Sequence, residues 1–174
     1  MSKENFKVTA KEDGKEHWIS RSVAVAVVVK GLSSSKEEDV FLVHKRGSGC
    51  PDFIGHWSTN CGYINWNETV REAAARELYE ESGLIVNPES LEFIGYNDPV
   101  GDGKENITLR FLVTLDRSYL QELLNSGSIN TDTKSRGGEE NEIEEFRLIL
   151  AQPEEIKALG SWAFEHDELL KKFI

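Results

Sequence analysis

Three glutamates and an arginine lie within six consecutive positions, from Arg76 to Glu81. Glu77, Glu80 and Glu81 stand at i, i+3 and i+4, so on an α-helix their carboxylates would share one face. Carboxylates this close repel one another. A protein tolerates that repulsion on a solvated surface, or uses it to bind a hard divalent cation through oxygen ligands. The spacing therefore indicates a metal-binding helix face, with a solvated acidic face as the alternative.

The residues around these glutamates favour a helix that packs on a sheet. Asn67 and Thr69 are both suitable N-caps, and Gly83 supplies a C-terminal stop. Apolar or small residues give the helix one face for close packing, at Val70, Ala73, Ala74 and Leu78. We therefore expect a helix from either Asn67 or Thr69 to Gly83, with its acids projecting towards the loop at 60–62.

The stretch from Gly62 to Leu84 resembles the Nudix box, whose pattern is G-x5-E-x7-R-E-U-x-E-E-x-G-U, with U a bulky aliphatic residue. Every specified position of the pattern is matched. The matching residues are Gly62, Glu68, Arg76, Glu77, Leu78, Glu80, Glu81, Gly83 and Leu84. Agreement at this many fixed positions is far more specific than a lone glycine-rich loop. The chain is thus similar to the Nudix hydrolases.

The resemblance implies an enzyme that cleaves a nucleoside diphosphate linked to another group, with Mg²⁺ or Mn²⁺ as cofactor. Carried over position by position, it implies as metal ligands Glu77, Glu80 and Glu81, supported by Glu68. Arg76 would orient these glutamates by ion pairing. The catalytic residues within the box would therefore be Arg76, Glu80 and Glu81.

The residues just before the box helix depart from the family in one respect. Family members often carry Pro-Gly-Gly there, and the first of those glycines offers its carbonyl to the metal. This chain has Asn60-Cys61-Gly62, so the carbonyl of Cys61 would take that place and Gly62 would allow the tight loop. The chain's net charge of −11 would repel a diphosphate, and bound cations would invert the local field at the site.

A long polar segment occupies residues 126–144. Polar connections of that length are usually functional or disordered, and we expect a flexible acidic loop. Gly137-Gly138 gives it a hinge, and glutamates follow directly. Some Nudix hydrolases that act on nucleotide sugars carry a similar glutamate-rich run, in which one acid is the general base. The resemblance thus implies Glu140 or Glu142 as the base, with a solvated loop as the alternative.

Candidate substrate contacts lie near the ends of the expected strands. Arg46 follows a strand where family members often place a basic group, so it would contact the diphosphate; a surface arginine is the alternative. Aromatic residues cluster around the box loop at Phe53, Trp57, Tyr63 and Trp66. One of them, with Trp57 and Tyr63 preferred, would stack on a nucleobase, although aromatic residues beside a core strand are more often core. Pro99 lies fifteen residues beyond Leu84, a spacing associated in the family with ADP-ribose pyrophosphatases.

Composition limits the class of protein. The chain has 174 residues, of which 39% are hydrophobic, enough for one globular domain over residues 1–174. Its net charge argues against a nucleic-acid polymer or an anionic membrane as partner. The apolar run at 23–29 is too short to span a membrane, and residues 1–8 lack a signal peptide's apolar segment. Two cysteines fit a reducing cytoplasm, which is the expected location.

Alternating elements indicate an α/β fold. A hairpin or extension is expected in residues 1–20. Further strands are expected at 22–30, 40–45, 91–96, 107–115 and 145–150, and helices at 117–125 and 154–173 besides the box helix. With the resemblance, this pattern predicts a Nudix-like α/β/α sandwich in which a mixed sheet lies between helices.

The favoured function is metal-dependent hydrolysis of the diphosphate in a nucleotide sugar such as ADP-ribose. A modified or ordinary nucleoside triphosphate is the nearest alternative substrate. A non-catalytic nucleotide sensor on the same fold is the alternative from another class, which the intact set of carboxylates disfavours. The expected partner is a small-molecule nucleotide, and a homodimer is an assembly frequent among the relatives.

Overall fold

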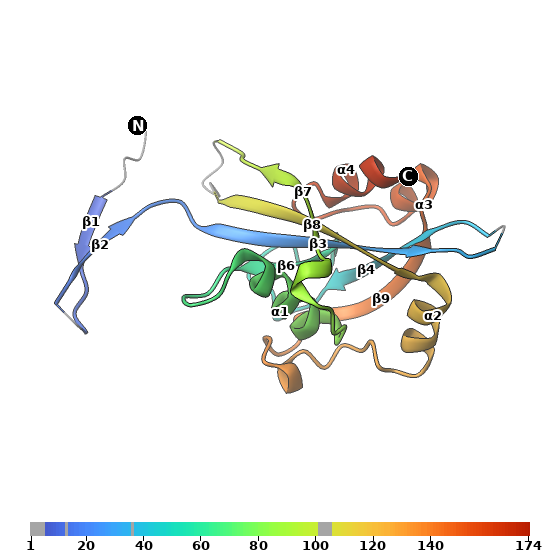
Figure 1. Cartoon of the computed structure of the whole chain (residues 1–174), viewed down its shortest axis with the longest axis horizontal. Helices are drawn as coiled ribbons and strands as arrows, with labels where there is room; N and C mark the ends of the chain where they lie inside the picture. The colour runs from blue at the N-terminus through green and yellow to red at the C-terminus, as the bar shows by residue number, and fades with distance from the viewer. Residues whose placement is uncertain (1–5, 13, 36, 101–105) are drawn as a thin grey trace.

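A mixed sheet of seven strands forms the centre of the protein in a computed structural model, which describes residues 6–12, 14–35, 37–100 and 106–174 (Figure 1). The strands are β3 (Val23–Leu32), β4 (Val40–Arg46), β5 (Trp57–Ser58), β6 (Asn60–Tyr63), β7 (Glu92–Asn97), β8 (Ile107–Asp116) and β9 (Ile143–Leu150). β3 and β8 run parallel along their whole length, and the other pairs are antiparallel. The strands expected from the sequence are confirmed, within a few residues at their ends.

Strand β3 supplies side chains to both faces of the sheet. Its run of valine and alanine is typical of a strand that is buried on both sides. Val25, Val27 and Val29 belong to one apolar core, and Val28 belongs to the other. Because side chains alternate along a strand, one element can hold two cores together.

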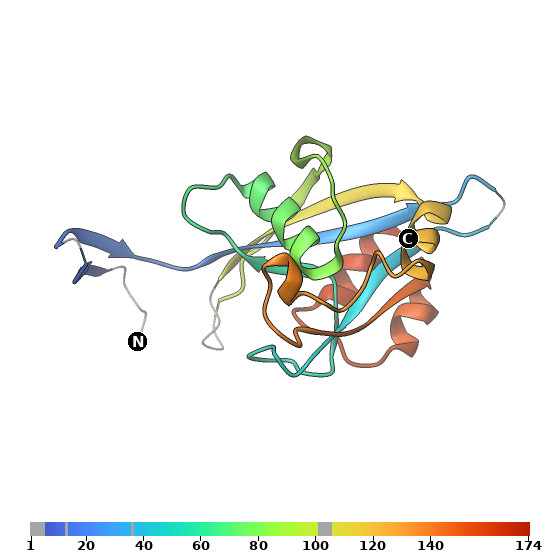
Figure 2. The same cartoon turned by 90° about the horizontal axis from the view of Figure 1, so that it is seen from below.

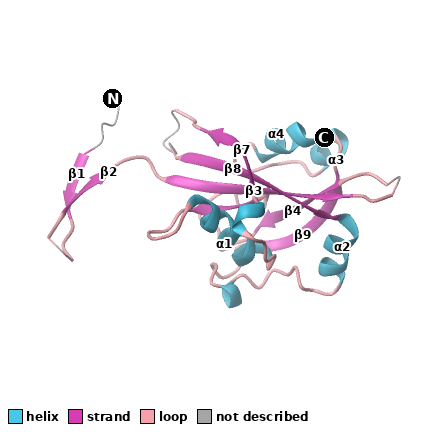
Figure 3. Ribbon diagram, in the orientation of Figure 1, coloured by secondary structure: helices cyan, strands magenta, loops and turns pink. Residues whose placement is uncertain are grey.

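Within the described ranges, four α-helices cover the two faces of the sheet (Figures 1 and 2). They are α1 (Val70–Ser82), α2 (Arg117–Asn125), α3 (Pro153–Ala158) and α4 (His166–Leu170). Leu78 of α1 and Leu120 of α2 lie in one core, whereas Ile156 of α3 and Leu169 of α4 lie in the other. Figure 3 shows the resulting layers of helix, strand and helix. The predicted α/β/α sandwich around a mixed sheet is therefore confirmed.

Strands β5 and β6 fill the space where β3 and β4 diverge. β4 pairs with β3 near one end and with β5 near the other, while β6 pairs with the first half of β3. The chain therefore crosses between the two long strands at Thr59. This crossing carries Cys61 and Gly62 to a place where α1 packs directly on their backbone.

A separate two-stranded sheet lies near the N-terminus. β1 (Phe6–Thr9) and β2 (Glu16–Ile19) pair antiparallel, and the N–H of Ala10 donates to the carbonyl of Lys15 at 2.9 Å. This hairpin lies apart from the large sheet (Figure 1). The hairpin expected within residues 1–20 is thus present.

The prediction of a single helix at 154–173 is wrong. The chain forms α3, α4 and a 3₁₀ turn at Lys171–Phe173 instead. Gly160, Phe164 and Glu165 all have left-handed φ angles, which interrupt a right-handed helix. Between them the backbone pairs with β5, since the N–H of Trp57 donates to the carbonyl of Ser161. Residues 161–163 therefore pair with the edge of β5 instead of continuing the helix that the periodicity of the sequence predicted.

Two other expectations concern connections and membrane spans. The segment at 126–144 contains a 3₁₀ turn, Lys134–Arg136, and packs against the C-terminal end of α1. The sequence also predicts a connection through Gly101-Asp102-Gly103 between the strands at 91–96 and 107–115, and these three residues lie outside the described ranges. Within the described ranges, none of the helices has the length and apolar character needed to cross a bilayer.

Candidate active site

Helix α1 begins and ends where local chemistry requires. The Thr69 hydroxyl accepts a hydrogen bond from the N–H of Glu72, and the Glu72 carboxylate accepts one from the N–H of Thr69. Gly83 ends the helix at φ 80°, a left-handed conformation that favours glycine. Asn67 also has a positive φ of 71° and belongs to the preceding turn. Of the two expected N-caps, Thr69 is therefore the one used.

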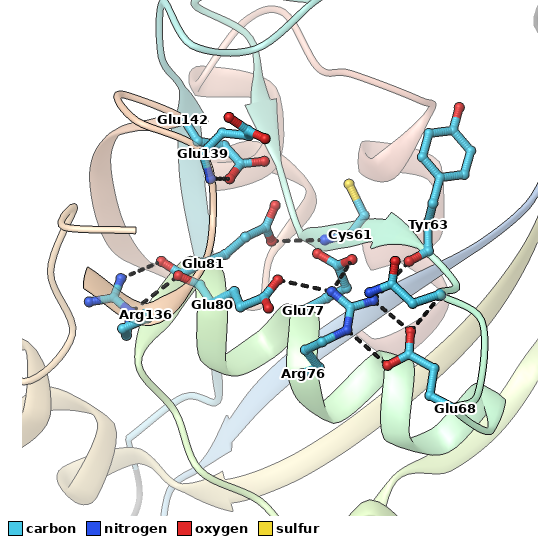
Figure 4. Close-up of polar contacts among 11 residues, drawn as sticks. Cys61, Tyr63, Glu68, Arg76, Glu77, Glu80, Glu81, Arg136, Glu139 and Glu142 are labelled. Atoms are coloured by element: carbon cyan, nitrogen blue, oxygen red, sulfur yellow. Dashed lines mark hydrogen bonds and ion pairs between the residues drawn. The ribbon is translucent and has the colours of Figure 1, made fainter. Parts of the chain in front are cut away.

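Arg76 lies at the centre of the acidic face of this helix (Figure 4). Its guanidinium donates to both carboxylate oxygens of Glu68, at 2.7 and 2.9 Å. It also donates to Glu77 at 2.8 Å and to Glu80 at 2.9 Å. A fifth hydrogen bond, to the carbonyl of Tyr63 at 2.8 Å, reaches the end of β6. The expected ion pairing of Arg76 is present, and it fastens the helix to the loop before it.

Glu77 packs against the backbone of Gly62. A β-carbon at position 62 would lie 2.2 Å from the Glu77 carboxylate, so a larger residue would displace that side chain. Burial raises the pKa of Glu77 to about 7, although the charge of Arg76 opposes the rise. The glycine of the box thus has a steric role, because it lets a carboxylate lie directly against β6.

Glu81 is the most buried of the box acids, with 1% of its surface exposed. Its Oε2 accepts a hydrogen bond from the N–H of Cys61 at 2.8 Å (Figure 4). Its Oε1 has no hydrogen-bond partner among the described residues. Burial raises the pKa of Glu81 well above its ordinary value, and the charges of Glu142 and Glu77 add to the rise. An oxygen left in this state is costly unless a ligand satisfies it.

The two candidate bases of the 126–144 loop differ in where they point. Glu142 lies near Glu81 and raises its pKa, and burial in turn raises the pKa of Glu142 itself. Glu140 instead forms an exposed ion pair with Lys134 at 2.6 Å. The structure therefore brings Glu142, but not Glu140, to the acids of the helix.

The backbone around Glu142 is docked against the loop that joins β4 to β5. The N–H of Gly47 donates to the Glu142 carbonyl at 2.7 Å, and the N–H of Gly49 donates to the Asn141 carbonyl at 2.9 Å. A β-carbon at position 49 would lie 2.0 Å from the carbonyl oxygen of Glu140, so the two backbones touch. On the side chain, Oε2 of Glu142 accepts from the N–H of Glu139 at 3.3 Å (Figure 4).

Arg136 is a residue of the site that the sequence did not single out. Its guanidinium donates to the carbonyls of Glu80 and Glu81, at 3.1 and 2.9 Å (Figure 4). These carbonyls lie in the last turn of α1, where helical donors run out. In the sequence, Arg136 is a basic residue within a glutamate-rich loop. A single arginine belongs to no spaced motif, so the sequence does not separate it from an ordinary surface arginine.

The box acids suit a divalent cation by their chemistry, although their side chains do not yet surround one. In the described part of the chain, no three His, Cys, Asp or Glu side chains converge as a ready metal site. Arg76 holds one oxygen each of Glu77 and Glu80 in an ion pair. The unpartnered oxygen of Glu81 and the repulsion among buried carboxylates are what a cation would relieve. The donor set therefore fits a hard cation once these side chains rotate.

The residues expected to contact substrate differ in how accessible they are. Arg46 is 6% exposed, because its guanidinium donates to the carbonyl and the carboxylate of Asp52, both at 3.1 Å, and lies 5.0 Å from the ring centre of Phe164. Trp57 is 4% exposed and belongs to the core beneath α3 and α4. Tyr63 is 61% exposed at the end of β6. Arg46 is thus engaged within its own loop and Trp57 is a core aromatic, which leaves Tyr63 open to a ligand.

Comparison with known proteins adds to this geometry. The model of the NUDIX domain matches residues 20–173. The chain is 27% identical over 169 residues to an ADP-ribose pyrophosphatase of Methanocaldococcus jannaschii, which covers 97% of this chain and 83% of that protein.

Solved structures share the fold at low identity. A MutT/nudix family protein from Enterococcus faecalis superposes with a TM-score of 0.62 at 17% identity, and the match covers 90% of this chain and 61% of that one. The NUDIX domain of Shewanella oneidensis NrtR complexed with ADP ribose superposes with a TM-score of 0.59 at 13% identity, covering 89% and 87%. Because the family model spans nearly all of the sheet and helices described above, the chain belongs to the Nudix hydrolase family.

Proposed function

We propose that this Nudix hydrolase cleaves the diphosphate bond of a nucleotide sugar, with ADP-ribose as the preferred substrate. The observation that carries the proposal is the approach of Glu142, from the loop, to Glu81, a buried acid of the box helix with an unpartnered oxygen. The Methanocaldococcus jannaschii relative, an ADP-ribose pyrophosphatase, and the NrtR domain complexed with ADP ribose support the choice of substrate. A nucleoside triphosphate remains the alternative that the experiment below must separate.

The acids of the helix are the proposed cation ligands. Mg²⁺ or Mn²⁺ would be held by Glu77, Glu80 and Glu81, with the Cys61 carbonyl as a further ligand and Glu68 in support. Such an ion, when bound, supplies positive charge to the phosphate oxygens and makes a water more acidic. Arg76 would then keep Glu68 in place and return to the other glutamates when the ion leaves.

Glu142 is the proposed general base in preference to Glu140. Burial raises the pKa of Glu142 towards neutral pH, which makes its carboxylate a stronger base for the proton of an attacking water. Its backbone is held by Gly47, whereas the Glu140 side chain is paired with Lys134 in solvent. A base must be held within reach of the reacting water, and only Glu142 is held on the side of the box helix.

Tyr63 is the proposed contact for the nucleoside. Its ring is exposed, and its carbonyl is tied to Arg76, so the residue borders the acidic face. An aromatic ring with one polar end can stack on a base or donate to a ribose oxygen.

The deciding experiment is a hydrolysis panel. Purified protein is assayed on ADP-ribose, other nucleotide sugars and nucleoside triphosphates, with Mg²⁺, with Mn²⁺ and with chelator, and the products are separated by chromatography. Release of AMP and ribose phosphate that chelator abolishes is the expected result. Pyrophosphate release from a triphosphate would replace the substrate, and nucleotide binding without any turnover would contradict an enzymatic role.

A further inference from the structure

Arg136 is the residue through which the loop between α2 and β9 grips helix α1 (Figure 4). Its Nε donates to the carbonyl of Glu80 at 3.1 Å, and its Nη2 donates to the carbonyl of Glu81 at 2.9 Å. The N–H of Leu84, which an α-helix would pair with the Glu80 carbonyl, donates to the hydroxyl of Ser82 instead. One guanidinium therefore satisfies the backbone of the two residues whose side chains belong to the acidic site.

The same guanidinium also orders its own loop. Its Nη1 donates to the side-chain oxygen of Asn130 at 2.8 Å, and its Nη2 donates to the Asn130 carbonyl at 2.9 Å. The next residue, Gly137, has φ 101°, and a β-carbon there would lie 3.4 Å from a carboxylate oxygen of Glu80. The loop backbone therefore lies directly against the acidic face of the helix at this point.

Glu142 lies a few residues further along this loop. Its carbonyl accepts from the N–H of Gly47, and the Asn141 carbonyl accepts from the N–H of Gly49. The stretch 136–142 is thus held at its start by Arg136 and at its end by the loop that joins β4 to β5. Arg136 attaches this stretch to helix α1, which carries Glu81. Its hydrogen bonds therefore connect the segment of Glu142 to the helix of Glu81.

We propose that Arg136 is a positioning residue, which fixes the loop to the last turn of α1 and so sets the place of Glu142 relative to Glu81. This inference rests on the function proposed above, because it names what assembles the two parts of that site. Without the guanidinium, the loop would lose its side-chain hydrogen bonds to the last turn of α1, while the carbonyls of Asn141 and Glu142 would keep their contacts with Gly47, Gly49 and Cys50. Catalytic groups must be held to within about half an ångström of their working geometry, so a looser Glu142 would lower kcat more than it would weaken substrate binding.

The kinetic test compares Arg136→Ala and Arg136→Lys with the wild type on ADP-ribose. In Arg136→Ala, kcat should fall by about 10-fold to 100-fold, while KM should change by less than about threefold. Arg136→Lys should keep part of the activity, since an ammonium group reaches one carbonyl but cannot bridge two. Millimolar guanidinium chloride should restore part of kcat in Arg136→Ala and should leave the wild type unchanged.

A second measurement does not depend on activity. Hydrogen exchange is followed at the amides of Gly47 and Gly49, which donate to carbonyls of the loop. In Arg136→Ala these amides should exchange at least about tenfold faster, while the amides of β3 keep their wild-type protection. The wild type and the variant are compared without substrate.

Arg117→Ala is the matched control. Arg117 on α2 also donates to a backbone carbonyl, that of Glu38 at 2.6 Å, and pairs with Glu37 at 3.6 Å. Its loss removes the same kind of contact, a guanidinium on a backbone carbonyl, from a loop away from the acidic face, although Arg117 makes fewer such bonds than Arg136. This variant should keep the wild-type kcat and the wild-type exchange at Gly47 and Gly49.

Two results would overturn the proposal. One is a folded Arg136→Ala protein whose kcat lies within twofold of wild type, and the other is unchanged exchange at Gly47 and Gly49. If Arg136→Ala does not fold, the same two criteria apply to Arg136→Lys. If the wild type hydrolyses nothing in the panel, the proposed function fails, and the exchange measurement alone decides whether Arg136 holds the loop.

Discussion

The carboxylate of Glu81 accepts a hydrogen bond from the backbone N–H of Cys61 at 2.8 Å, and this contact joins helix α1 to strand β6. It uses Oε2, whereas Oε1 is buried without a donor in the described part of the protein. One carboxylate oxygen of Glu81 is thus already hydrogen-bonded to the backbone. The Asn60 amide lies near the carboxylate and opposes the rise in the pKa of Glu81 that burial causes, but the other oxygen has no hydrogen bond of ordinary geometry within the described ranges, and it is the oxygen that we propose for a ligand.

Glu81→Gln should separate these two roles. An amide oxygen can still accept from Cys61, so we expect the protein to fold, but the amide carries no charge for a cation. We expect kcat to fall at least about a hundredfold, on the scale of losing a major electrostatic contribution. Steady-state kinetics and a thermal melt check both expectations.

The matched control is Glu72→Gln on the same helix. Glu72 belongs to the capping box, and glutamine serves there as well as glutamate. This variant should keep kcat within about twofold of wild type. If Glu81→Gln behaved like Glu72→Gln, the role of Glu81 as a ligand would be wrong.

Gly62→Ala should disturb Glu77 by steric contact alone. The added methyl group would lie 2.2 Å from the Glu77 carboxylate, so that side chain must move. We expect kcat to fall by at least about tenfold, since a ligand displaced by about 1 Å is costly. The same kinetic assay measures the loss.

A double-mutant cycle identifies the cause of that loss. If Gly62→Ala acts through Glu77, the variant Gly62→Ala with Glu77→Ala should lose no more activity than Glu77→Ala alone. Additive losses would show that the methyl group acts elsewhere, for example on the pairing of β6 with β3.

Divalent cations should stabilise the protein. Burial raises the pKa of Glu81 and of Glu77, and repulsion from neighbouring carboxylates adds to the rise: Glu142 and Glu77 act on Glu81, and Glu80 and Glu142 act on Glu77. A bound cation would relieve this repulsion. At ten times Kd, binding adds about 1.4 kcal/mol to the free energy of unfolding, which corresponds to about 3–6 °C in Tm for a chain of this size. Thermal melts with Mg²⁺, Mn²⁺ and chelator measure the shift. A smaller shift is expected in Glu81→Gln, and no shift with any divalent ion would favour a solvated acidic face.

His44 should make stability depend on pH. Burial, together with the charges of Arg46 and His166, lowers the pKa of His44 to about 3. An unfolded chain protonates its histidines near pH 6.5. Between about pH 6.5 and pH 3 the unfolded state therefore binds more protons, and the contribution of His44 to the free energy of unfolding is lost as the pH falls.

His44→Leu isolates this contribution. Glu77 has a raised pKa and gives the opposite trend, since its stabilising effect is present at low pH and is lost as the pH rises through about 7. Neither ring nitrogen of His44 has a partner among the described residues, so leucine should be tolerated. Relative to wild type, the variant should gain up to about 3 kcal/mol between about pH 7.5 and pH 4.5, measured by urea unfolding in chelator. A difference that does not change with pH would contradict a buried, neutral histidine.

Local chemistry explains which parts of the fold were predictable. The caps of α1 at Thr69 and Gly83 depend on neighbours within a few residues, and the valine run of β3 reports burial on both faces. The prediction of a helix at 154–173 failed because the N–H of Trp57 pairs with Ser161, a contact between residues far apart in the sequence. Periodicity carries no information about such a competitor.

The sequence by itself determined the chemistry of the site: the spacing of Glu77, Glu80 and Glu81 on one helix face, and the Nudix box around them, follow from residues close together in the chain. The tertiary structure decided which side chains reach that face. It brought Glu142 to Glu81, left Glu140 in solvent, and placed the guanidinium of Arg136 on the end of α1. It also buried Trp57 and Arg46. The reason is physical. Burial and contacts between residues far apart in the sequence depend on how the sheet, the helix and the loops pack together, and no local pattern in the sequence encodes that packing.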